Sequence, residues 1–166
     1  MRVEEVMSTG VVTAYPTDPV RSVVIKMVSR HCGAVPVIDE GQSLIGLVAI
    51  RDIMIPLFPN YGDYIHDNVH SRDFGEMEEG YSEILRKQVE EIMSKNPLTV
   101  SPTTCILEAA SYMGLKHFRR IPVAENGKLV GMVSIGDINR GLFFNKGFLL
   151  DTTTGAHQQD AAARVN

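Results

Sequence analysis

Two stretches of this chain are written twice. "VEEVMS" at Val3–Ser8 returns as "VEEIMS" at Val89–Ser94, 86 positions later, and "LIGLVAIRDI" at Leu44–Ile53 returns as "LVGMVSIGDI" at Leu129–Ile138, 85 positions later. One residue is therefore extra in the first copy, in the turn near Gln42. A spacing sustained over about 50 residues indicates a tandem duplication. A unit of that size cannot close a hydrophobic core alone, so we expect the two copies to pack together.

Each copy has the pattern of a β-α-β-β-α unit. In the first copy, a short strand at 11–14 precedes a helix with apolar residues at i, i+3, i+4 and i+7 from Val20. Two β-branched strands follow, at 34–38 and 44–50, and a second helix opens at Asp52. The second copy repeats these elements as a strand at 98–101, a helix from Ile106, strands at 120–124 and 129–135, a helix at Asp137, and a hairpin turn at Asn126-Gly127.

The repeat divides the chain into four parts. Residues 1–58 and 89–145 are the two copies, 59–88 are a helical and loop linker, and 146–166 are a polar C-terminal tail. Within the linker we expect a loop around Ser71–Gly80 and then a helix leading into the second copy. The predicted fold class is α/β (α+β), with two tandem β-α-β-β-α repeats packed sheet to sheet with pseudo-two-fold symmetry.

Charge and composition exclude several classes of protein. The 166-residue chain has a net charge of −4, whereas a dedicated nucleic-acid binder needs a basic excess to neutralise phosphates. No apolar run reaches the roughly 18 residues of a membrane helix, and two glutamates near the N-terminus do not fit a signal peptide. Cys32 and Cys105 are too few for a disulfide framework and form no metal-binding pattern. We therefore expect a cytoplasmic protein without membrane insertion.

The repeated stretches resemble cystathionine β-synthase (CBS) domains. The resemblance rests on "V..IM", "R.IPV" and "NG.LVG.VS..DI" and covers about Val3–Leu57 and Val89–Leu142. Two such domains in tandem resemble the pair called a Bateman module. The resemblance implies a regulatory sensor that binds an adenosine-type ligand (AMP or ATP, or NAD or S-adenosylmethionine) in clefts between the repeats and relays its presence to a protein target. It also implies a homodimer, no enzymatic activity and no cofactor beyond this ligand.

Ser134-x-x-Asp137 is similar to the ribose-binding motif of this family. A carboxylate at a helix start can accept hydrogen bonds from the two vicinal hydroxyls of a ribose, and a hydroxyl three residues earlier can bind the adjacent phosphate or sugar. In the family, this carboxylate faces the first strand of the other repeat and the segment before its second strand. The resemblance therefore groups Ser134 and Asp137 with Val12, Thr13, Gly33, Ala34 and Val35, where small residues would leave room for an adenine.

The second cleft departs from the motif, because Ala49 stands where the serine would precede Asp52. The resemblance groups Asp52 with Leu98, Thr99, Arg119 and Arg120, and the two guanidinium groups suit phosphate. The two clefts are therefore expected to differ, with adenosine bound at Asp137.

These residues also have purely structural interpretations. Ser134-x-x-Asp137 matches a helix capping box, and Asp52 could be a plain helix cap. The basic run "KHFRR" at Lys116–Arg120 could be a solvated helix end. A second function stays open as well, a dimerisation or interaction module whose ligand sites are vestigial.

Histidines are the remaining candidates. "HDNVH" at His66–His70 resembles the zinc-protease pattern H-E-x-x-H, which would make the chain a metal-dependent hydrolase. Asp67 replaces the glutamate and no third ligand is specified, so we prefer a solvated linker helix and predict no metal site. His31 and His117 occupy equivalent positions at the ends of the first helices, where they could pack, cap the helix or contact a phosphate.

Overall fold

The computed structural model describes residues 1–58 and 74–147, and its mixture of helices and strands confirms the predicted α+β class. The chain forms two compact units. Unit 1 contains Met1–Thr9, Thr99–Val123 and Val130–Asn166, and unit 2 contains Gly10–Leu98 and Ala124–Leu129. Unit 1 is thus built mainly from the second copy of the repeat, and unit 2 mainly from the first.

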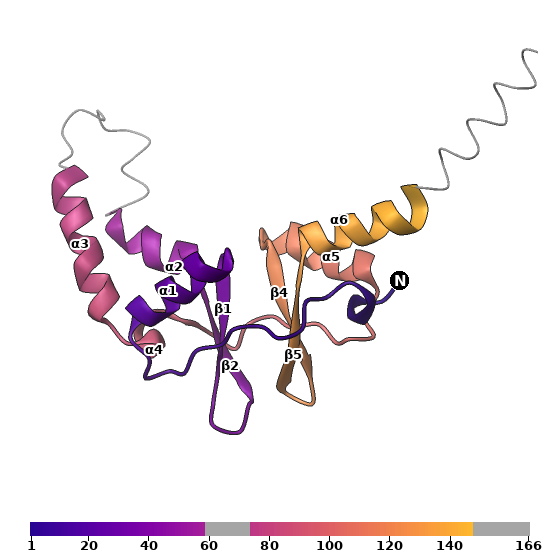
Figure 1. Cartoon of the computed structure of the whole chain (residues 1–166), viewed down its shortest axis with the longest axis horizontal. Helices are drawn as coiled ribbons and strands as arrows, with labels where there is room; N and C mark the ends of the chain where they lie inside the picture. Colours follow the sequence, from indigo (N-terminus) through magenta and orange to yellow (C-terminus); the bar gives the residue numbers. More distant parts are fainter. Residues whose placement is uncertain (59–73, 148–166) are drawn as a thin grey trace, which may run out of the picture. The chain divides into compact units, whose positions relative to one another are not determined.

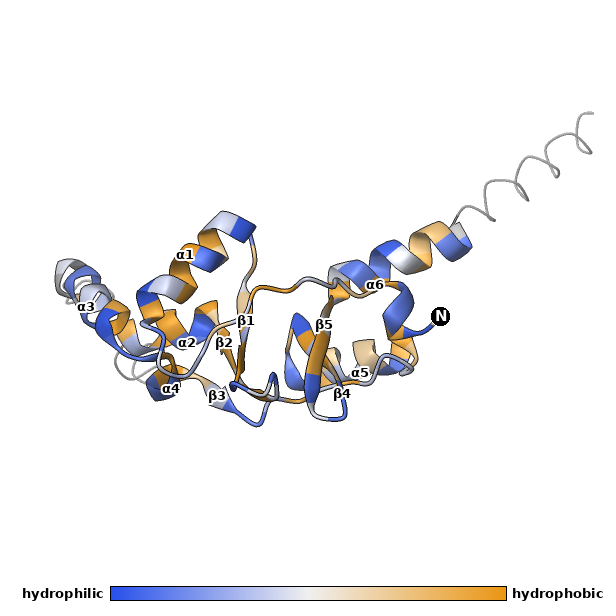
Figure 2. Ribbon diagram, turned by 60° about the horizontal axis from the view of Figure 1, so that its bottom comes forward, coloured by the Kyte–Doolittle hydropathy of each residue, from blue (hydrophilic) through white to orange (hydrophobic). Residues whose placement is uncertain are grey.

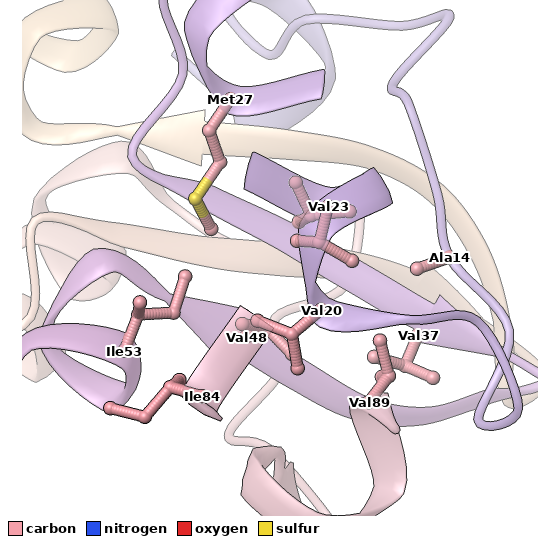
Figure 3. Close-up of a cluster of buried hydrophobic side chains, with 10 residues drawn as sticks. Ala14, Val20, Val23, Met27, Val37, Val48, Ile53, Ile84 and Val89 are labelled. Atoms are coloured by element: carbon pink, nitrogen blue, oxygen red, sulfur yellow. The ribbon is translucent and has the colours of Figure 1, made fainter. Parts of the chain in front are cut away.

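Unit 2 is built on an antiparallel sheet of order β1-β2-β3. The apolar stripe of its first helix is buried against this sheet, and Figure 3 shows Val20, Val23 and Met27 gathered with Val37 and Val48 of two strands. The elements of unit 2 are α1 (Val20–Arg30), β1 (Ala34–Ile38), β2 (Leu44–Ala49), α2 (Ile50–Met54), the 3-10 helix η2 (Ile55–Leu57), α3 (Phe74–Arg86), α4 (Val89–Ile92) and β3 (Ser94–Lys95).

Unit 1 repeats this plan around the hairpin of β4 and β5. The turn of this hairpin falls within 124–129, the part of the second copy that belongs to unit 2, and its residues Asn126 and Gly127 have φ of 52° and 77°, as the Asn-Gly hairpin signal predicts. Figure 2 shows β5 hydrophobic along most of its length, whereas α6 carries residues of both kinds. The elements are the 3-10 helix η1 (Val3–Glu5), α5 (Ile106–Lys116), β4 (Arg120–Glu125), β5 (Lys128–Ser134), α6 (Ile135–Leu142) and the π-helix η5 (Phe143–Gly147).

The two copies exchange their first segments. Val3, in the first "VEE" segment, is fully buried in the core of unit 1, and its N–H donates to the carbonyl of Thr104 at 2.9 Å. Val89, in the second such segment, is fully buried in the core of unit 2, and its N–H donates to the carbonyl of Asp18 at 2.9 Å. Figure 1 shows the indigo N-terminal segment beside the orange elements of unit 1. Each core is therefore completed by residues of the other copy.

Glycines make this exchange sterically possible. Ser8 pairs with Met132 of β5, and a Cβ on neighbouring Gly131 would lie 2.8 Å from the carbonyl oxygen of Ser8. In unit 2 a Cβ on Gly46 would meet the side chain of Met93 at 3.2 Å or less. The repeated glycine in "L.G.V" thus leaves space for the repeated Met-Ser pair of the incoming segment.

The first strand predicted for each copy is too long. In each copy the structure has a single parallel β-bridge at this place. Ala14 pairs with Val37, its N–H donating to the carbonyl of Pro36 at 3.0 Å, and Val100 pairs with Val123. To extend the Ala14–Val37 pairing toward the N-terminus, the next hydrogen bond would need an N–H on Pro36. To extend it toward the C-terminus, the next hydrogen bond would need an N–H on Pro16. Proline has none, so pairing stops after one residue.

The predicted loop around Ser71–Gly80 is wrong from Phe74 onward, where α3 begins. Met77, Tyr81 and Ile84 lie on one face of this helix at helical spacing, and Ile84 is buried in the core of unit 2. Burial of this stripe offsets the helix-breaking tendency of Gly75 and Gly80. The predictions for 59–73 and for 148–166 lie outside the described residues.

The two equivalent histidines end their helices. His31 follows α1 with φ of 51° and His117 follows α5 with φ of 55°, the left-handed conformation that closes a helix. The next residue in each case donates its N–H back five positions, Cys32 to Met27 and Phe118 to Met113, both at 3.0 Å. Of the roles considered for these histidines, capping is confirmed.

Candidate functional site

Asp137 is held at the start of α6 by Ser134. The helix begins at Ile135 and not at Asp137 as predicted, so the aspartate is the third helical residue. Its Oδ2 accepts hydrogen bonds from the backbone N–H of Ser134 at 2.9 Å and from the Ser134 hydroxyl at 2.6 Å. The Asp137 N–H donates to Ser134 Oγ at 3.1 Å. The capping-box interpretation is therefore confirmed, and the box fixes the carboxylate in one orientation.

The second oxygen of this carboxylate has a weaker partner. Arg140 Nη2 lies 3.3 Å from Asp137 Oδ1, and the Arg140 side chain is 69% exposed against 15% for Asp137. An exposed single ion pair of this length contributes about 0–1 kcal/mol. Oδ1 thus keeps the capacity to accept hydrogen bonds from another donor.

The first copy holds its aspartate less firmly. Asp52 accepts the backbone N–H of Ala49 at 2.8 Å, which is the half of the capping box that needs no hydroxyl. It is likewise the third helical residue of α2 and not the helix cap itself, because α2 begins at Ile50. Burial raises the pKa of the Asp52 carboxyl, with the Ala49 hydrogen bond and the charge of Arg51 opposing the rise. The two copies therefore differ as Ala49 predicted, because the first copy holds its aspartate with fewer hydrogen bonds than the second.

A cavity of about 440 Å³ opens beside Asp137 within unit 1. Its volume lies in the range of about 300–1,000 Å³ typical of small-molecule sites. The residues that line it come from the N-terminal segment and from the α6–η5 region: Met1, Glu5, Val6, Asp137, Arg140, Gly141, Phe144 and Asn145. The cavity thus combines carboxylates, a guanidinium group, an amide and an aromatic ring.

Gly141 lets the N-terminal segment approach α6. A Cβ at this position would lie 2.5 Å from Val6 Cγ1 and 3.0 Å from Met1 Cε. Any larger residue would push the segment away from the helix, because real Cβ atoms do not approach other heavy atoms so closely. The first copy has Pro56 at the equivalent position, so this wall of the cavity is particular to the second copy.

The remaining predicted site residues fall in both units. Ser134 and Asp137 are in unit 1, whereas Val12, Thr13, Gly33, Ala34 and Val35 are in unit 2; Asp52 and Leu98 are in unit 2, whereas Thr99, Arg119 and Arg120 are in unit 1. Within its own unit, the Gly33 carbonyl accepts the N–H of Ile50, and the Arg119 carbonyl accepts the N–H of Ile135, both at 3.1 Å. Both groupings stay predictions.

Sequence reasoning missed most of the cavity. Arg140 could have been found, because it lies three positions after Asp137 on a helix and such pairs meet. Glu5 and Val6 could not, since no local pattern says that the N-terminal segment packs against the second copy. The same holds for Phe144, which η5 brings to the cavity.

Other candidate sites receive little from the structure. The pair His66 and His70 lies outside the described residues, and within the described ranges no three His, Cys, Asp or Glu side chains gather as a metal site would require. Within the described ranges, 1–58 and 74–147, no helix is both long and apolar enough to span a membrane.

Comparison with known proteins gives consistent matches. A family model described as "CBS domain" matches residues 3–57 and 89–143. The CBS domain-containing protein YhcV of Bacillus subtilis is 25% identical over 156 residues, which cover 94% of this chain and 96% of YhcV. The crystal structure of the CBS-pair protein CBSX2 from Arabidopsis thaliana is 25% identical, with a TM-score of 0.71 over 87% of this chain and 96% of CBSX2. The structure of CBSX2 in complex with AMP, also 25% identical, has a TM-score of 0.67 over 87% of this chain and 98% of that one.

Proposed function

This chain belongs to the CBS domain family, and on that premise we propose that it is a regulatory module that binds an adenosine-type ligand and relays its presence to a partner protein. The observation that carries the proposal is the Asp137 carboxylate, oriented by Ser134 and placed on the wall of a 440 Å³ cavity. The AMP complex of CBSX2, which has the same fold, supports the adenosine-type ligand.

The chemistry of the carboxylate suits a ribose. Ser134 uses Oδ2 of Asp137. Among the described residues Oδ1 has only the long contact to Arg140, so hydroxyl donors of a diol can bind Oδ1. Hydrogen bonds to a charged acceptor are about twice as strong as neutral ones. The capping box keeps the carboxylate in place before the ligand arrives, which reduces the entropy cost of binding.

We assign the supporting residues by the family resemblance. Val12, Thr13 and the Gly33–Val35 segment would complete the Asp137 site around the adenine. Asp52 would form a second, weaker site with Leu98, Thr99 and the phosphate-binding Arg119 and Arg120. The module would act as a homodimer with no catalysis of its own, and the ligand would favour one packing of the dimer over another.

Isothermal titration of the full chain with AMP, ATP, NAD and S-adenosylmethionine tests the proposal. We expect one of them to bind, and Asp137→Asn to weaken it about tenfold or more, because a charged acceptor is lost. Asparagine keeps an oxygen for the Ser134 N–H, so the helix start should stay intact. Asp52→Asn is the matched control and should leave the tighter site unchanged. Absence of binding by all four, or undiminished binding to Asp137→Asn, would contradict the proposal.

The second candidate is a dimerisation module with vestigial sites. It is favoured by the missing hydroxyl at Ala49 and by exposed apolar residues on the first helices, including Ile25 and Val28 of α1 and Leu107 and Leu115 of α5. A ligand that binds only the folded state must raise the melting temperature. A dimer by light scattering whose melting temperature ignores every adenosine derivative would favour this candidate.

A further inference from the structure

The equivalent helices α1 and α5 each leave apolar side chains uncovered on the side away from their own core. On α1, Ile25 and Val28 are 58% and 70% exposed and lie one turn apart. On α5, Leu107 and Leu115 are 59% and 76% exposed and lie on one face, about two turns apart. Large apolar side chains gathered on one exposed face are typical of a surface that binds another protein.

The two exposed faces differ in shape at equivalent positions. At the repeat spacing of 86, Ile25 and Val28 of α1 correspond to Ser111 and Gly114 of α5, which are also exposed. The α1 face therefore has a ridge where the α5 face has a hollow between its two leucines. Beyond its own stretch of helix, no described atom lies within 4 Å of the Cβ position of Gly114, so the hollow is open. Close packing sets large side chains opposite small ones, so the ridge of α1 fits the hollow of α5 better than a second ridge.

The charges of the two helices favour the same pairing. The α1 helix contains Arg21, Lys26 and Arg30 and no acidic residue, and both arginines are exposed. Two α1 helices placed face to face would bring four guanidinium groups together with no carboxylate from either helix. The α5 helix carries one exposed acid, Glu108, and one exposed base, Lys116. Pairing α1 with α5 thus avoids a like-charge contact and supplies one carboxylate.

We propose that two protomers associate through these faces, with α1 of one protomer packed against α5 of its partner. This inference rests on the proposed function, since it takes the module to be a homodimer. In a two-fold dimer the same contact occurs twice, so both apolar faces of both protomers are covered. Unit 2 of one protomer, with Asp52, thereby contacts unit 1 of the other, with Asp137.

Cysteine cross-linking of the full chain tests which helices meet. The native thiols are first removed by Cys32→Ala and Cys105→Ser, and light scattering compares this background with the wild type. Val28→Cys and Gly114→Cys are then co-expressed in this background on chains with different tags and treated with a short bismaleimide. We expect a covalent dimer that carries both tags, and no covalent dimer when either variant is treated alone.

Two further variants make the result specific. Ser111→Cys replaces Gly114→Cys as the partner of Val28→Cys, which allows for either direction of the paired helices and leaves the helix glycine unchanged. Glu40→Cys, exposed in the turn between β1 and β2, is the matched control for random collision and should give no covalent dimer with Gly114→Cys.

The outcomes separate the pairing from the function on which it rests. A covalent dimer from Val28→Cys alone would show α1 against α1 and overturn the pairing, while the homodimer would stand. A dimeric background in which Val28→Cys cross-links to neither Ser111→Cys nor Gly114→Cys would overturn the pairing in the same way. A wild type that is monomeric by light scattering would overturn both the pairing and the homodimer, and titration with adenosine derivatives tests the ligand site independently of either.

Discussion

At the scale of single residues, the two copies differ most at the position that precedes each aspartate. Ser134 gives and receives hydrogen bonds at the start of α6, whereas Ala49 offers only its backbone N–H to Asp52. One copy therefore has a complete capping box with a fixed carboxylate. The other has half a box and a carboxyl whose pKa is raised by burial.

Replacing the serine by alanine, and the alanine by serine, should change the free energy of unfolding in opposite directions. Ser134→Ala removes the acceptor for the Asp137 N–H and should lower the free energy of unfolding by about 0.5–2 kcal/mol. Ala49→Ser supplies the missing hydroxyl in the first copy and should raise it by about 0.5–1 kcal/mol. Urea denaturation followed by circular dichroism measures both, and equal effects of the same sign would contradict the capping account.

The raised pKa of Asp52 makes stability depend on pH. A carboxyl with a raised folded-state pKa binds its proton more tightly in the folded protein than in the unfolded chain. The protonated carboxyl therefore contributes fully to the free energy of unfolding below pH 3.8, its ordinary pKa, and this contribution is lost as the pH rises through the folded-state pKa. Asp52→Asn does not titrate and keeps an oxygen for the Ala49 N–H. The variant should therefore gain stability over the wild type as the pH rises from below 3.8 through the folded-state pKa of Asp52. Melting temperatures across this range test it, and a difference that does not grow with pH would count against it.

At the scale of elements, close backbone approach decides where the exchanged segments dock. Ser8 lies against β5 because Gly131 has no side chain, and Met93 lies against β2 because Gly46 has none. The incoming segments are short, since η1 spans three residues and α4 spans four. Helices of this length are not stable alone, so docking and helix formation occur together.

Gly131→Ala should therefore be destabilising by about 1–3 kcal/mol, because its Cβ meets a backbone carbonyl that cannot move aside. Gly114→Ala is the control, as no atom lies within 4 Å of its Cβ position and it sits in α5. That change should stabilise by about 0.4–1 kcal/mol. Denaturation midpoints give both values, and a neutral Gly131→Ala would show that Ser8 does not lie against β5.

At the scale of the whole molecule, each core depends on residues from both copies. Val3 packs with Ile106 and Ile121, and Val89 packs with Val20 and Val48. A cut between the copies would remove a fully buried side chain from each core. The two copies are therefore units of sequence and not independent units of folding.

Val3→Ala should cost about 2–3 kcal/mol, because it opens a cavity in a fully buried site. The loss should appear first in unit 1, although the substitution lies in the first copy. Hydrogen exchange is the measurement, with protection expected to fall in α5 and α6 before α1. Val89→Ala should give the reverse order, and loss of protection in the mutated copy itself would contradict the exchange.

The sequence was a good guide to what repeats locally. The span of β1, the apolar stripes of α1 and α5 and the hairpin at Asn126 follow from periodicity and turn chemistry, and all are present. The first strands shrank because their ladders meet prolines, an effect that requires knowing the pairing partner. The cavity beside Asp137 was not foreseeable for a related reason, since periodicity does not say which copy an element joins.

The exchange of segments also bears on how the chain is made. Arg2 donates a hydrogen bond to the carbonyl of Thr103, 101 positions away, so this segment finds its partners only after the second copy of the repeat has been synthesised. The buried core of unit 2 is complete earlier, once α4 has emerged. Contacts this distant in sequence close slowly, because the loop entropy is lost before the contact is gained. The segment that shapes the cavity at Asp137 is thus made long before its partners and is among the last to settle, and the cavity forms only once the second copy has been synthesised.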